Sequence, residues 1–202
     1  MLKRLRSAMT RFWTPVADWL LARGVSPDAV TIAGTVVVVL AALALFPSGH
    51  LLVGALVIAV FALTDSLDGV MARRGNRSGP WGAFLDSTLD RFADAAIFAG
   101  LVLWFIGRGD DRLAAVLALA CLVLGSIVPY ARARAEGLGL TASVGIAERA
   151  DRLVVVLTGT AMVGVGLPAG VLTVVLGLLA VASAVTVGQR VATVRRQTRV
   201  TT

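Results

Sequence analysis

Long apolar segments alternate with short polar segments along most of the chain. A helix needs about 20 apolar residues to cross the hydrocarbon core of a membrane. Six segments of that kind follow one another, separated by turn-forming or charged residues. The pattern therefore predicts an all-α integral membrane protein with six transmembrane helices. We expect these helices at 28–46, 51–73, 80–107, 112–132, 148–166 and 169–190, with a short polar cytoplasmic tail after them.

The first part of the chain follows a different pattern. Apolar residues such as Leu5 and Trp19 recur at helical spacing, and basic residues fall between them. This arrangement predicts an amphipathic helix that lies on the membrane surface. The stretch before Pro15 has no continuous apolar core, so no cleavable signal peptide is expected. We therefore expect an N-terminal juxtamembrane amphipathic helix, residues 1–25, and a six-helix membrane domain, residues 26–202.

The composition agrees with a membrane protein: 57% of the residues are apolar and the mean hydropathy is +0.87, whereas soluble domains have about 45–50% apolar residues. A net charge of +7 would favour nucleic acid as a partner of a soluble protein, but membrane proteins concentrate basic residues in cytoplasmic loops. With the N-terminus inside, 16 of the 19 basic residues are cytoplasmic, Arg108 and Arg112 are outside, and Arg91 lies within a helix. We therefore predict a multi-pass plasma-membrane protein with both termini in the cytoplasm and no nucleic-acid partner.

Four aspartates interrupt two successive apolar segments. Asp65 and Asp68 lie near the end of the second predicted helix, and Asp86 and Asp90 lie near the start of the third. An aspartate at mid-helix in a membrane costs about 2.5–3.5 kcal/mol, so these residues need a functional explanation. The i,i+3 and i,i+4 spacings place each pair on one helix face. At about 1.5 Å per residue, both pairs reach a similar depth from the cytoplasmic surface, and an antiparallel hairpin would bring them together.

Four neighbouring carboxylates require cations, because like charges at low dielectric disfavour ionisation. Oxygen ligands suit Mg²⁺, Mn²⁺ or Ca²⁺ better than zinc, and Mg²⁺ commonly keeps positions for substrate phosphate. The sequence therefore predicts a divalent-metal site for a phosphorylated substrate, opening to the cytoplasmic side. Small residues around the aspartates leave room either for that ligand or for a neighbouring helix. Arg73 is placed to pair with a phosphate or to anchor at the membrane surface.

Together these residues form the pattern D-x-x-D-G-x-x-A-R, then eight residues, then G-x-x-x-D-x-x-x-D, over residues 65–90. The pattern resembles the signature of the CDP-alcohol phosphotransferases, and every fixed position matches. The resemblance implies a six-helix membrane fold, usually a homodimer, whose aspartates hold Mg²⁺ or Mn²⁺, with two ions per site. It also implies that Asp65, Asp68 and Asp86 are metal ligands, and that Asp90 is both a metal ligand and the general base.

The resemblance further implies that CDP-diacylglycerol binds at the cytoplasmic ends of the first three helices. The segment 26–31 is similar to the family's helix start, and its Ser-Pro dipeptide is typical of an N-cap followed by a first helical turn. In the implied reaction, Asp90 takes a proton from an acceptor hydroxyl, whose oxygen attacks the β-phosphorus and displaces CMP. The implied contacts to the CDP-lipid are Asp28, Ala29, Val30, Thr31, Gly69, Ala72, Arg73, Gly79 and Gly82.

Three further arginines lie near helix ends on the same side of the membrane as the aspartates: Arg132, Arg152 and Arg190. They act either as membrane anchors or, if they converge, as the binding site for a phosphorylated acceptor. Two segments within 130–153 resemble a branch of the family, the actinobacterial phosphatidylinositol-phosphate synthases, whose acceptor is myo-inositol phosphate. In that branch a lysine stands at the position of Arg132 and a serine at the position of Pro129.

Two other functions remain open on the sequence. Glycerol 3-phosphate is the acceptor of phosphatidylglycerophosphate synthases in the same family, and the same arginines suit its phosphate. A cation channel or transporter would also place aspartates inside a membrane, although aspartates gathered near one surface fit a continuous ion path poorly.

Overall fold

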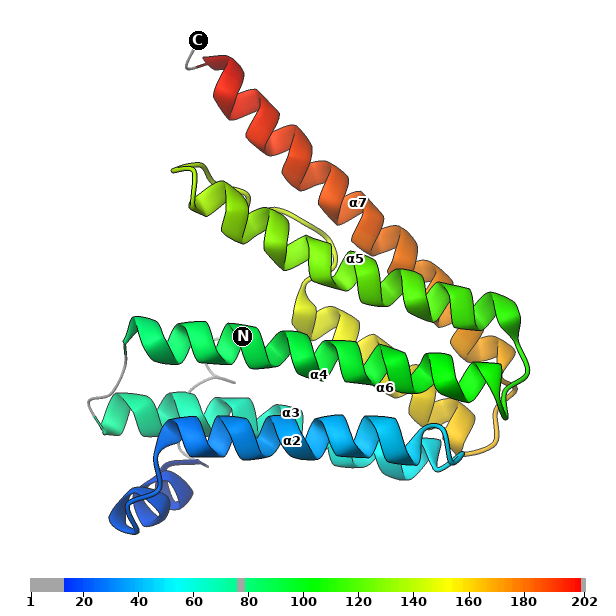
Figure 1. Ribbon diagram of the computed structural model, residues 1–202, viewed down its shortest axis with the longest axis horizontal. Helices are drawn as coiled ribbons and strands as arrows, with labels where there is room; N and C mark the ends of the chain where they lie inside the picture. The colour runs from blue at the N-terminus through cyan, green and yellow to red at the C-terminus, as the bar shows by residue number, and fades with distance from the viewer. Residues whose placement is uncertain (1–12, 76–78, 201–202) are drawn as a thin grey trace.

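The computed structural model describes residues 13–75 and 79–200, except for the side chains of residues 63–66, 68 and 200. All regular structure in this part of the chain is helical, as the sequence predicts. A helical segment at 13–22 precedes six longer helices (Figure 1). These are α2 (Pro27–Leu45), α3 (Leu51–Arg74), α4 (Pro80–Ile106), α5 (Arg112–Glu136), α6 (Arg149–Gly164) and α7 (Gly170–Val200).

The helix ends follow local signals in the sequence. The Ser26 hydroxyl caps α2 by accepting a hydrogen bond from the Ala29 N–H, at a donor–acceptor distance of 3.2 Å. Two helices run further than the sequence-based expectation. Helix α5 continues to Glu136 instead of ending near 132, and α7 continues to Val200, so the predicted polar tail is helical up to that residue. No Gly or Pro interrupts the last ten residues of α7, which explains why the helix does not end earlier.

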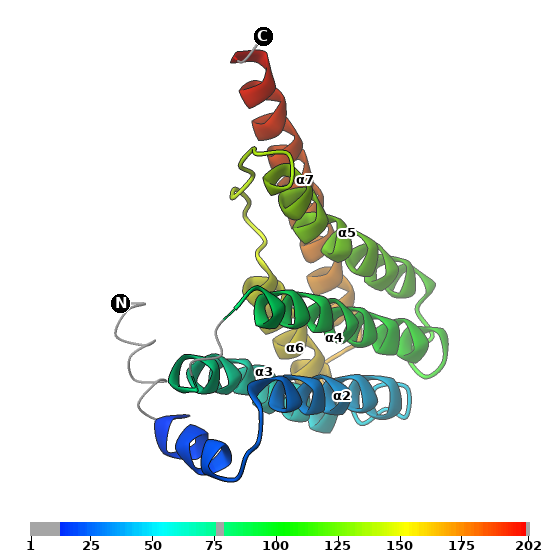
Figure 2. The same ribbon diagram turned by 60° about the vertical axis from the view of Figure 1, so that its left-hand side comes forward.

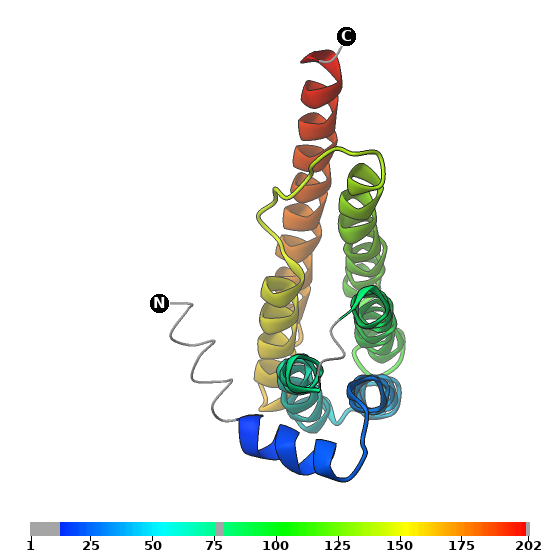
Figure 3. The same ribbon diagram turned by 90° about the vertical axis from the view of Figure 1, so that its left-hand side faces the viewer.

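Each of the six helices packs against two others, so that they form a closed ring in the order α2, α3, α6, α7, α5, α4. In Figure 1, α2, α3 and α4 run along a common direction, whereas α5 and α7 diverge from them toward the C-terminus. In Figure 3, α2, α3 and α4 are seen end-on, and α5 and α7 stand almost upright and extend above them. The buried apolar core lies inside this ring and includes Phe46, Ile58, Ile97, Leu101 and Leu176.

We call the end of the bundle that holds the loops α2–α3, α4–α5 and α6–α7 the closed end. Here the helices approach one another closely, around the fully buried side chain of Phe46. A methyl group added at Gly100 would lie 2.9 Å from the carbonyl carbon of Ala42, and one added at Gly164 would lie 2.8 Å from the Cα atom of Leu52. Small residues therefore permit backbone contact between helices at this end.

The opposite end, which we call the open end, carries the starts of α2, α4 and α6 and the ends of α3, α5 and α7. The long loop between α5 and α6 lies beside α7 here (Figure 2). The Thr186 hydroxyl oxygen accepts hydrogen bonds from the backbone N–H groups of Ile146 and Ala147, at 3.2 and 3.1 Å. Further along α7, the Gln197 amide accepts from the Thr141 N–H at 3.0 Å and donates to the Thr141 carbonyl at 2.6 Å. Thr186 and Gln197 thus both attach the loop to α7.

The N-terminal helical segment packs against the last turns of α3. Its Ala17 is fully buried beside Met71, and the Asp18 carboxylate lies 2.5 Å from Nε of Arg74. Trp19 is 54% exposed, so an apolar face of this segment remains available to a membrane surface. Residues 1–12 of the predicted amphipathic helix lie outside the described part of the chain.

Three helices in the described part of the chain are long and apolar enough to cross a membrane: α2, α5 and residues 170–199 of α7. Helices α3 and α4 carry the signature aspartates, and α6 has only 16 residues. Large apolar side chains face outward on the bundle, including Leu40 and Leu178, which are 62% and 66% exposed. Such surfaces on a helical bundle are suited to contact with lipid.

Candidate active site

The four signature aspartates lie toward the open end, near the end of α3 and the start of α4 (Figure 1). On α4, Asp86 is exposed, and Asp90, one turn further along, keeps 18% of its side-chain surface accessible. The described residues contain no group of three or more His, Cys, Asp or Glu side chains placed to hold a metal. The side chains of Asp65 and Asp68 are not among those described, so the four-aspartate metal site stays a prediction.

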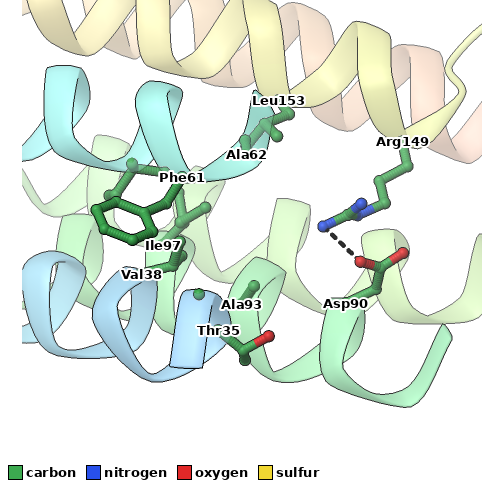
Figure 4. Close-up of a pocket in the computed structure, with 11 residues that line it drawn as sticks. Thr35, Val38, Phe61, Ala62, Asp90, Ala93, Ile97, Arg149 and Leu153 are labelled. Atoms are coloured by element: carbon green, nitrogen blue, oxygen red, sulfur yellow. Dashed lines mark ion pairs between the residues drawn. The ribbon is translucent and has the colours of Figure 1, made fainter. Parts of the chain in front are cut away.

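Asp90 forms the central ion pair of the open end. Its Oδ1 atom lies 2.8 Å from Nη2 of Arg149, which reaches across from the first turn of α6 (Figure 4). Its Oδ2 atom lies 3.8 Å from Nη2 of the adjacent Arg91. The carboxylate that the sequence identifies as the general base is thus held between helices α4 and α6 by a guanidinium group.

A small cavity of about 20 Å³ lies beside this ion pair, between α2, α3, α4 and α6 (Figure 4). Apart from Asp90 and Arg149, most of its wall is apolar, including Val38, Phe61 and Leu153. A cavity of this size holds about one water molecule. Little solvent therefore reaches this side of the Asp90 carboxylate, and the ion pair supplies the compensation that water would otherwise give.

A second and larger cavity, of about 260 Å³, opens between α4, α5, α6 and α7. Two glutamates, Glu136 and Glu148, and three apolar residues contribute to its wall, but basic side chains dominate it. The three arginines that the sequence singled out converge here, and two more join them. The five are Arg91, Arg132, Arg149, Arg152 and Arg190. Guanidinium groups in this density favour an anionic ligand, above all one carrying a phosphate.

Two of these arginines are almost fully buried and are held by backbone carbonyl groups. Arg190 is 5% exposed and donates from Nε to the Val144 carbonyl at 2.9 Å, and from Nη1 to the Val128 carbonyl. Arg152 is 3% exposed and donates from Nη1 to the Ala147 carbonyl at 3.2 Å. The Nε atom of Arg152 has no hydrogen-bond partner among the described residues. A buried donor that lacks a protein acceptor can donate a hydrogen bond to a bound anion.

Pro129 has a direct part in placing these side chains. A proline within a helix has no N–H, so the carbonyl four residues earlier loses its intrahelical donor. In α5 that carbonyl belongs to Gly125, and it accepts from Nη2 of Arg152 at 3.4 Å and from Nη1 of Arg91 at 3.5 Å. Pro129 therefore leaves the Gly125 carbonyl free to accept hydrogen bonds from two arginines.

Asp94, one helical turn beyond Asp90, lies close to three of the arginines that line the larger cavity. Its carboxylate oxygens lie 3.5 Å from Nη1 of Arg91, 3.2 Å from Nε of Arg149 and 3.5 Å from Nη2 of Arg152. By contrast, Arg132 is half exposed at the mouth of the larger cavity and pairs with Glu136 on its own helix, at 2.8 Å. The arginines of the cavity thus range from buried, as Arg152 and Arg190 are, to half exposed, as Arg132 is.

At the start of α2, Asp28 accepts a hydrogen bond from the indole N–H of Trp81 on α4, at 3.0 Å. Methyl groups added at Gly79 or Gly82 would meet nothing within 4 Å, so the surface beside them is open to a ligand. Val30 is partly buried and packs against the apolar cluster under the N-terminal segment.

The other residues implied in CDP-lipid binding lie at the same end. Ala29 and Arg73 are exposed, whereas Thr31 and Ala72 are half-buried. The hydroxyl of Thr31 donates to the Pro27 carbonyl at 3.1 Å. A methyl group added at Gly69 would lie 3.5 Å from Nη1 of Arg73, so the guanidinium covers that glycine. Their roles in nucleotide binding stay predictions.

Sequence reasoning missed Arg91, Arg149 and Trp81 as residues of this region. Arg91 carried a usable signal, because an arginine inside a predicted membrane helix needs a partner. Arg149 and Trp81 gave no such signal, since each reaches a partner on a helix that is distant in the sequence.

The sequence places the protein in a known family of membrane enzymes. Residues 24–185 match the family model described as CDP-alcohol phosphatidyltransferase, and the chain belongs to this family. It is therefore a CDP-alcohol phosphatidyltransferase, and with its apolar helices it is a multi-pass membrane protein.

Similar proteins carry a more particular name. The chain is 48% identical over 208 residues to the phosphatidylinositol phosphate synthase of Cutibacterium acnes, covering 97% of this chain and 98% of that protein. It is 46% identical over 201 residues to the phosphatidylinositol phosphate synthase of Streptomyces avermitilis, covering 96% of this chain and 82% of the relative.

Solved structures of the Mycobacterium tuberculosis phosphatidylinositol phosphate synthase share the fold at 44% identity. The form with CDP-diacylglycerol bound gives a TM-score of 0.88 and covers 91% of this chain and 94% of the other. The complex with manganese and citrate gives a TM-score of 0.87 and covers 90% and 88%.

Proposed function

We propose that this enzyme is a phosphatidylinositol-phosphate synthase, which transfers the phosphatidyl group of CDP-diacylglycerol to myo-inositol phosphate and releases CMP. The observation that carries the proposal is the arginine-lined cavity beside Asp90, in a chain whose relatives of that name are 46–48% identical over nearly its whole length. The same family membership favours an enzyme over the cation channel considered from the sequence.

The acceptor would bind with its phosphate in the larger cavity. Arg152 and Arg190 are fixed by backbone carbonyls and can form charge-assisted hydrogen bonds without reordering. The free Nε donor of Arg152 is suited to a phosphate oxygen. Arg132, at the cavity mouth, would exchange its pairing with Glu136 for the incoming anion. This placement directs the rest of the acceptor toward Asp90.

Asp90 would take the proton of the acceptor hydroxyl. The oxygen then attacks the β-phosphorus of CDP-diacylglycerol, the bond to the CMP oxygen breaks, and CMP leaves. The apolar wall around the smaller cavity limits water beside Asp90, which reduces competition from hydrolysis.

The residues that would hold divalent metal are Asp65, Asp68, Asp86 and Asp90. The donor chemistry fits Mg²⁺ or Mn²⁺, because α4 offers carboxylate oxygens at the open end, while His50 lies at the closed end and Cys121 is buried in α5. Two ions per site would neutralise the pyrophosphate and the departing CMP.

The nucleotide would lie at the open end between the starts of α2 and α4 and the end of α3. The open surface at Gly79 and Gly82 gives the diphosphate access, and Arg73 lies exposed nearby. The start of α2 directs its backbone N–H groups at this region, which favours a phosphate.

We further propose that all six helices cross the plasma membrane, with the open end and both termini in the cytoplasm. The 16 basic residues assigned to one side support this orientation. The N-terminal helix would lie in the membrane surface, and two chains would form a homodimer. Labelling of single introduced cysteines in sealed vesicles would test the orientation, and chemical cross-linking would test the dimer.

The main test of the proposed function is metal-dependent CMP release from CDP-diacylglycerol with myo-inositol phosphate. Replacing the base, Asp90→Asn, should lower kcat by about 10²–10⁴-fold. Asp110→Asn is the matched control, because it removes the same charge from an exposed residue at the closed end, and asparagine tolerates the positive φ of 43° there. Full activity of Asp90→Asn would contradict the assigned mechanism.

A second assay tests the acceptor. The purified enzyme is given CDP-diacylglycerol with radiolabelled myo-inositol phosphate or radiolabelled glycerol 3-phosphate. Incorporation of the inositol phosphate is expected. Incorporation of glycerol phosphate alone would identify a phosphatidylglycerophosphate synthase and leave the reaction class unchanged.

A further inference from the structure

Arg149 is the one arginine that lines both the small cavity beside Asp90 and the larger arginine-lined cavity. Its Nη2 atom lies 2.8 Å from Oδ1 of Asp90 (Figure 4), and its Nε atom lies 3.2 Å from Oδ1 of Asp94. The guanidinium group therefore stands between the arginine-lined cavity and the carboxylate assigned as general base. A ligand that moves the guanidinium group of Arg149 into the larger cavity would therefore also break its ion pair with Asp90.

The contacts of Arg149 differ from those of Arg152 and Arg190. Arg190 donates to two backbone carbonyls, and Arg152 donates to two backbone carbonyls and lies 3.5 Å from a single carboxylate, that of Asp94. Arg149 is paired with two carboxylates. A phosphate dianion competes with carboxylates for a guanidinium group through the same bidentate geometry. Of these arginines, Arg149 is the one whose partner an incoming phosphate can replace most directly.

Asp94 can hold Arg149 in place while Arg149 exchanges Asp90 for a phosphate. It contacts Nε of Arg149, near the base of the guanidinium group, whereas Asp90 contacts the terminal Nη2 atom. The terminal nitrogen can turn toward the cavity while the Nε contact is retained. Asp94 also lies 3.5 Å from Arg152, so it stays charge-compensated in either arrangement.

We infer that Arg149 is a positioning residue that couples acceptor binding to Asp90. Without acceptor, Arg149 holds Oδ1 of Asp90. When a phosphate enters the cavity, Arg149 turns to it and releases Asp90 for the metal and for the acceptor hydroxyl. The inference rests on the proposed function. It has a thermodynamic consequence: an anion in the cavity should tighten the binding of divalent metal, and metal should tighten the binding of the anion by the same factor.

The test measures Mn²⁺ affinity of the purified full chain by electron paramagnetic resonance, with and without inorganic phosphate, in the absence of CDP-lipid. Native protein should bind Mn²⁺ at least about fivefold more tightly when phosphate is present. Arg149→Gln should already bind Mn²⁺ tightly without phosphate, and phosphate should then change its affinity less than twofold. Arg149→Lys keeps the charge but cannot contact both carboxylates with one planar group, so it should fall between the two.

The matched control is Arg134→Gln, which removes one positive charge from an exposed position on the last turn of α5, outside the cavity. It should behave as the native protein and also corrects for direct binding of Mn²⁺ by phosphate. A phosphate effect that persists unchanged in Arg149→Gln would overturn the inference, as would its absence in native protein. Native Mn²⁺ binding that Asp90→Asn does not weaken would instead contradict the proposed metal site, and the inference with it.

Discussion

The two ends of the helix bundle are held together by different forces. At the closed end, small residues allow helix backbones to touch, and apolar side chains such as Phe46 fill the remaining space. At the open end, α5 and α7 separate from α2, α3 and α4 (Figure 1), and the space between them contains charged side chains and cavities. Close packing fixes the geometry of the first end, and hydrogen bonds from arginines to carbonyls and carboxylates fix that of the second.

This difference explains how a membrane protein can expose a charged site without losing its fold. Close van der Waals contact between helices does not require ligands and tolerates no extra volume. By contrast, an arginine that lines a cavity can exchange its hydrogen-bond partner when an anion enters that cavity. We therefore expect substitutions at the closed end to change stability, and substitutions at the open end to change substrate binding.

The largest effect is expected at Gly100. Valine there would press its side chain against the backbone of Ala42, which neither helix can move aside, and should lower the free energy of unfolding by about 3 kcal/mol. For a chain of this size that corresponds to roughly 6–12 °C in melting temperature. Gly188→Ala is the control, because its methyl group meets nothing within 4 Å and alanine favours the helix. A changed KM for the acceptor, with unchanged melting temperature, would break the comparison between the ends.

A smaller effect, of the opposite kind, is expected for Pro129→Ala at the open end. Alanine restores an N–H that would bond the Gly125 carbonyl, so Arg152 and Arg91 would lose their acceptor there. The helix should gain stability, while KM for the acceptor should rise about fivefold, corresponding to about 1 kcal/mol for long hydrogen bonds of this kind. Pro168→Ala, in the loop at the closed end, is the control and should leave KM unchanged. A loss of thermal stability with native KM would contradict the role given to Pro129.

The smallest effect concerns Asp111, which caps α5 at the closed end. Hydrogen bonds from the Ala114 N–H and then from the Thr173 hydroxyl lower the pKa of its carboxyl group. A lowered pKa means that the carboxylate stabilises the fold at neutral pH, and that this contribution is lost as the pH falls below about 4. Asp111→Ala should lower the melting temperature by about 2 °C at pH 7, with a smaller difference at pH 3. If the difference in melting temperature between the native protein and Asp111→Ala were the same at both pH values, the charge of Asp111 would not contribute to stability.

The sequence predicted the helices well because each depends on information within its own segment. Apolar length, the Ser26 cap and the glycine- and proline-bearing turns gave six helices whose starts lie close to the expected positions. The continuation of α7 to Val200 was missed, because a polar segment after an apolar one was interpreted as a tail. Polarity marks where a helix leaves the apolar core of a membrane, not where it ends.

Only part of the candidate site could be predicted from the sequence. Arg132, Arg152 and Arg190 could be proposed together because all lie at one predicted surface. Which neighbours they meet depends on the order of helices in the ring, and the spacing of residues within one helix does not encode that order. The contact of Arg149 with Asp90 therefore appeared only in three dimensions.

The attachment of the α5–α6 loop to Gln197 has a practical side for protein engineering. That residue lies seven positions beyond Arg190, in a part of α7 that would ordinarily be trimmed as a polar extension before crystallisation or attachment of an affinity tag. Shortened versions should retain the chain through at least this glutamine. Otherwise the loop that carries Val144, and with it the carbonyl that orients Arg190, would lose its hydrogen bonds to Gln197.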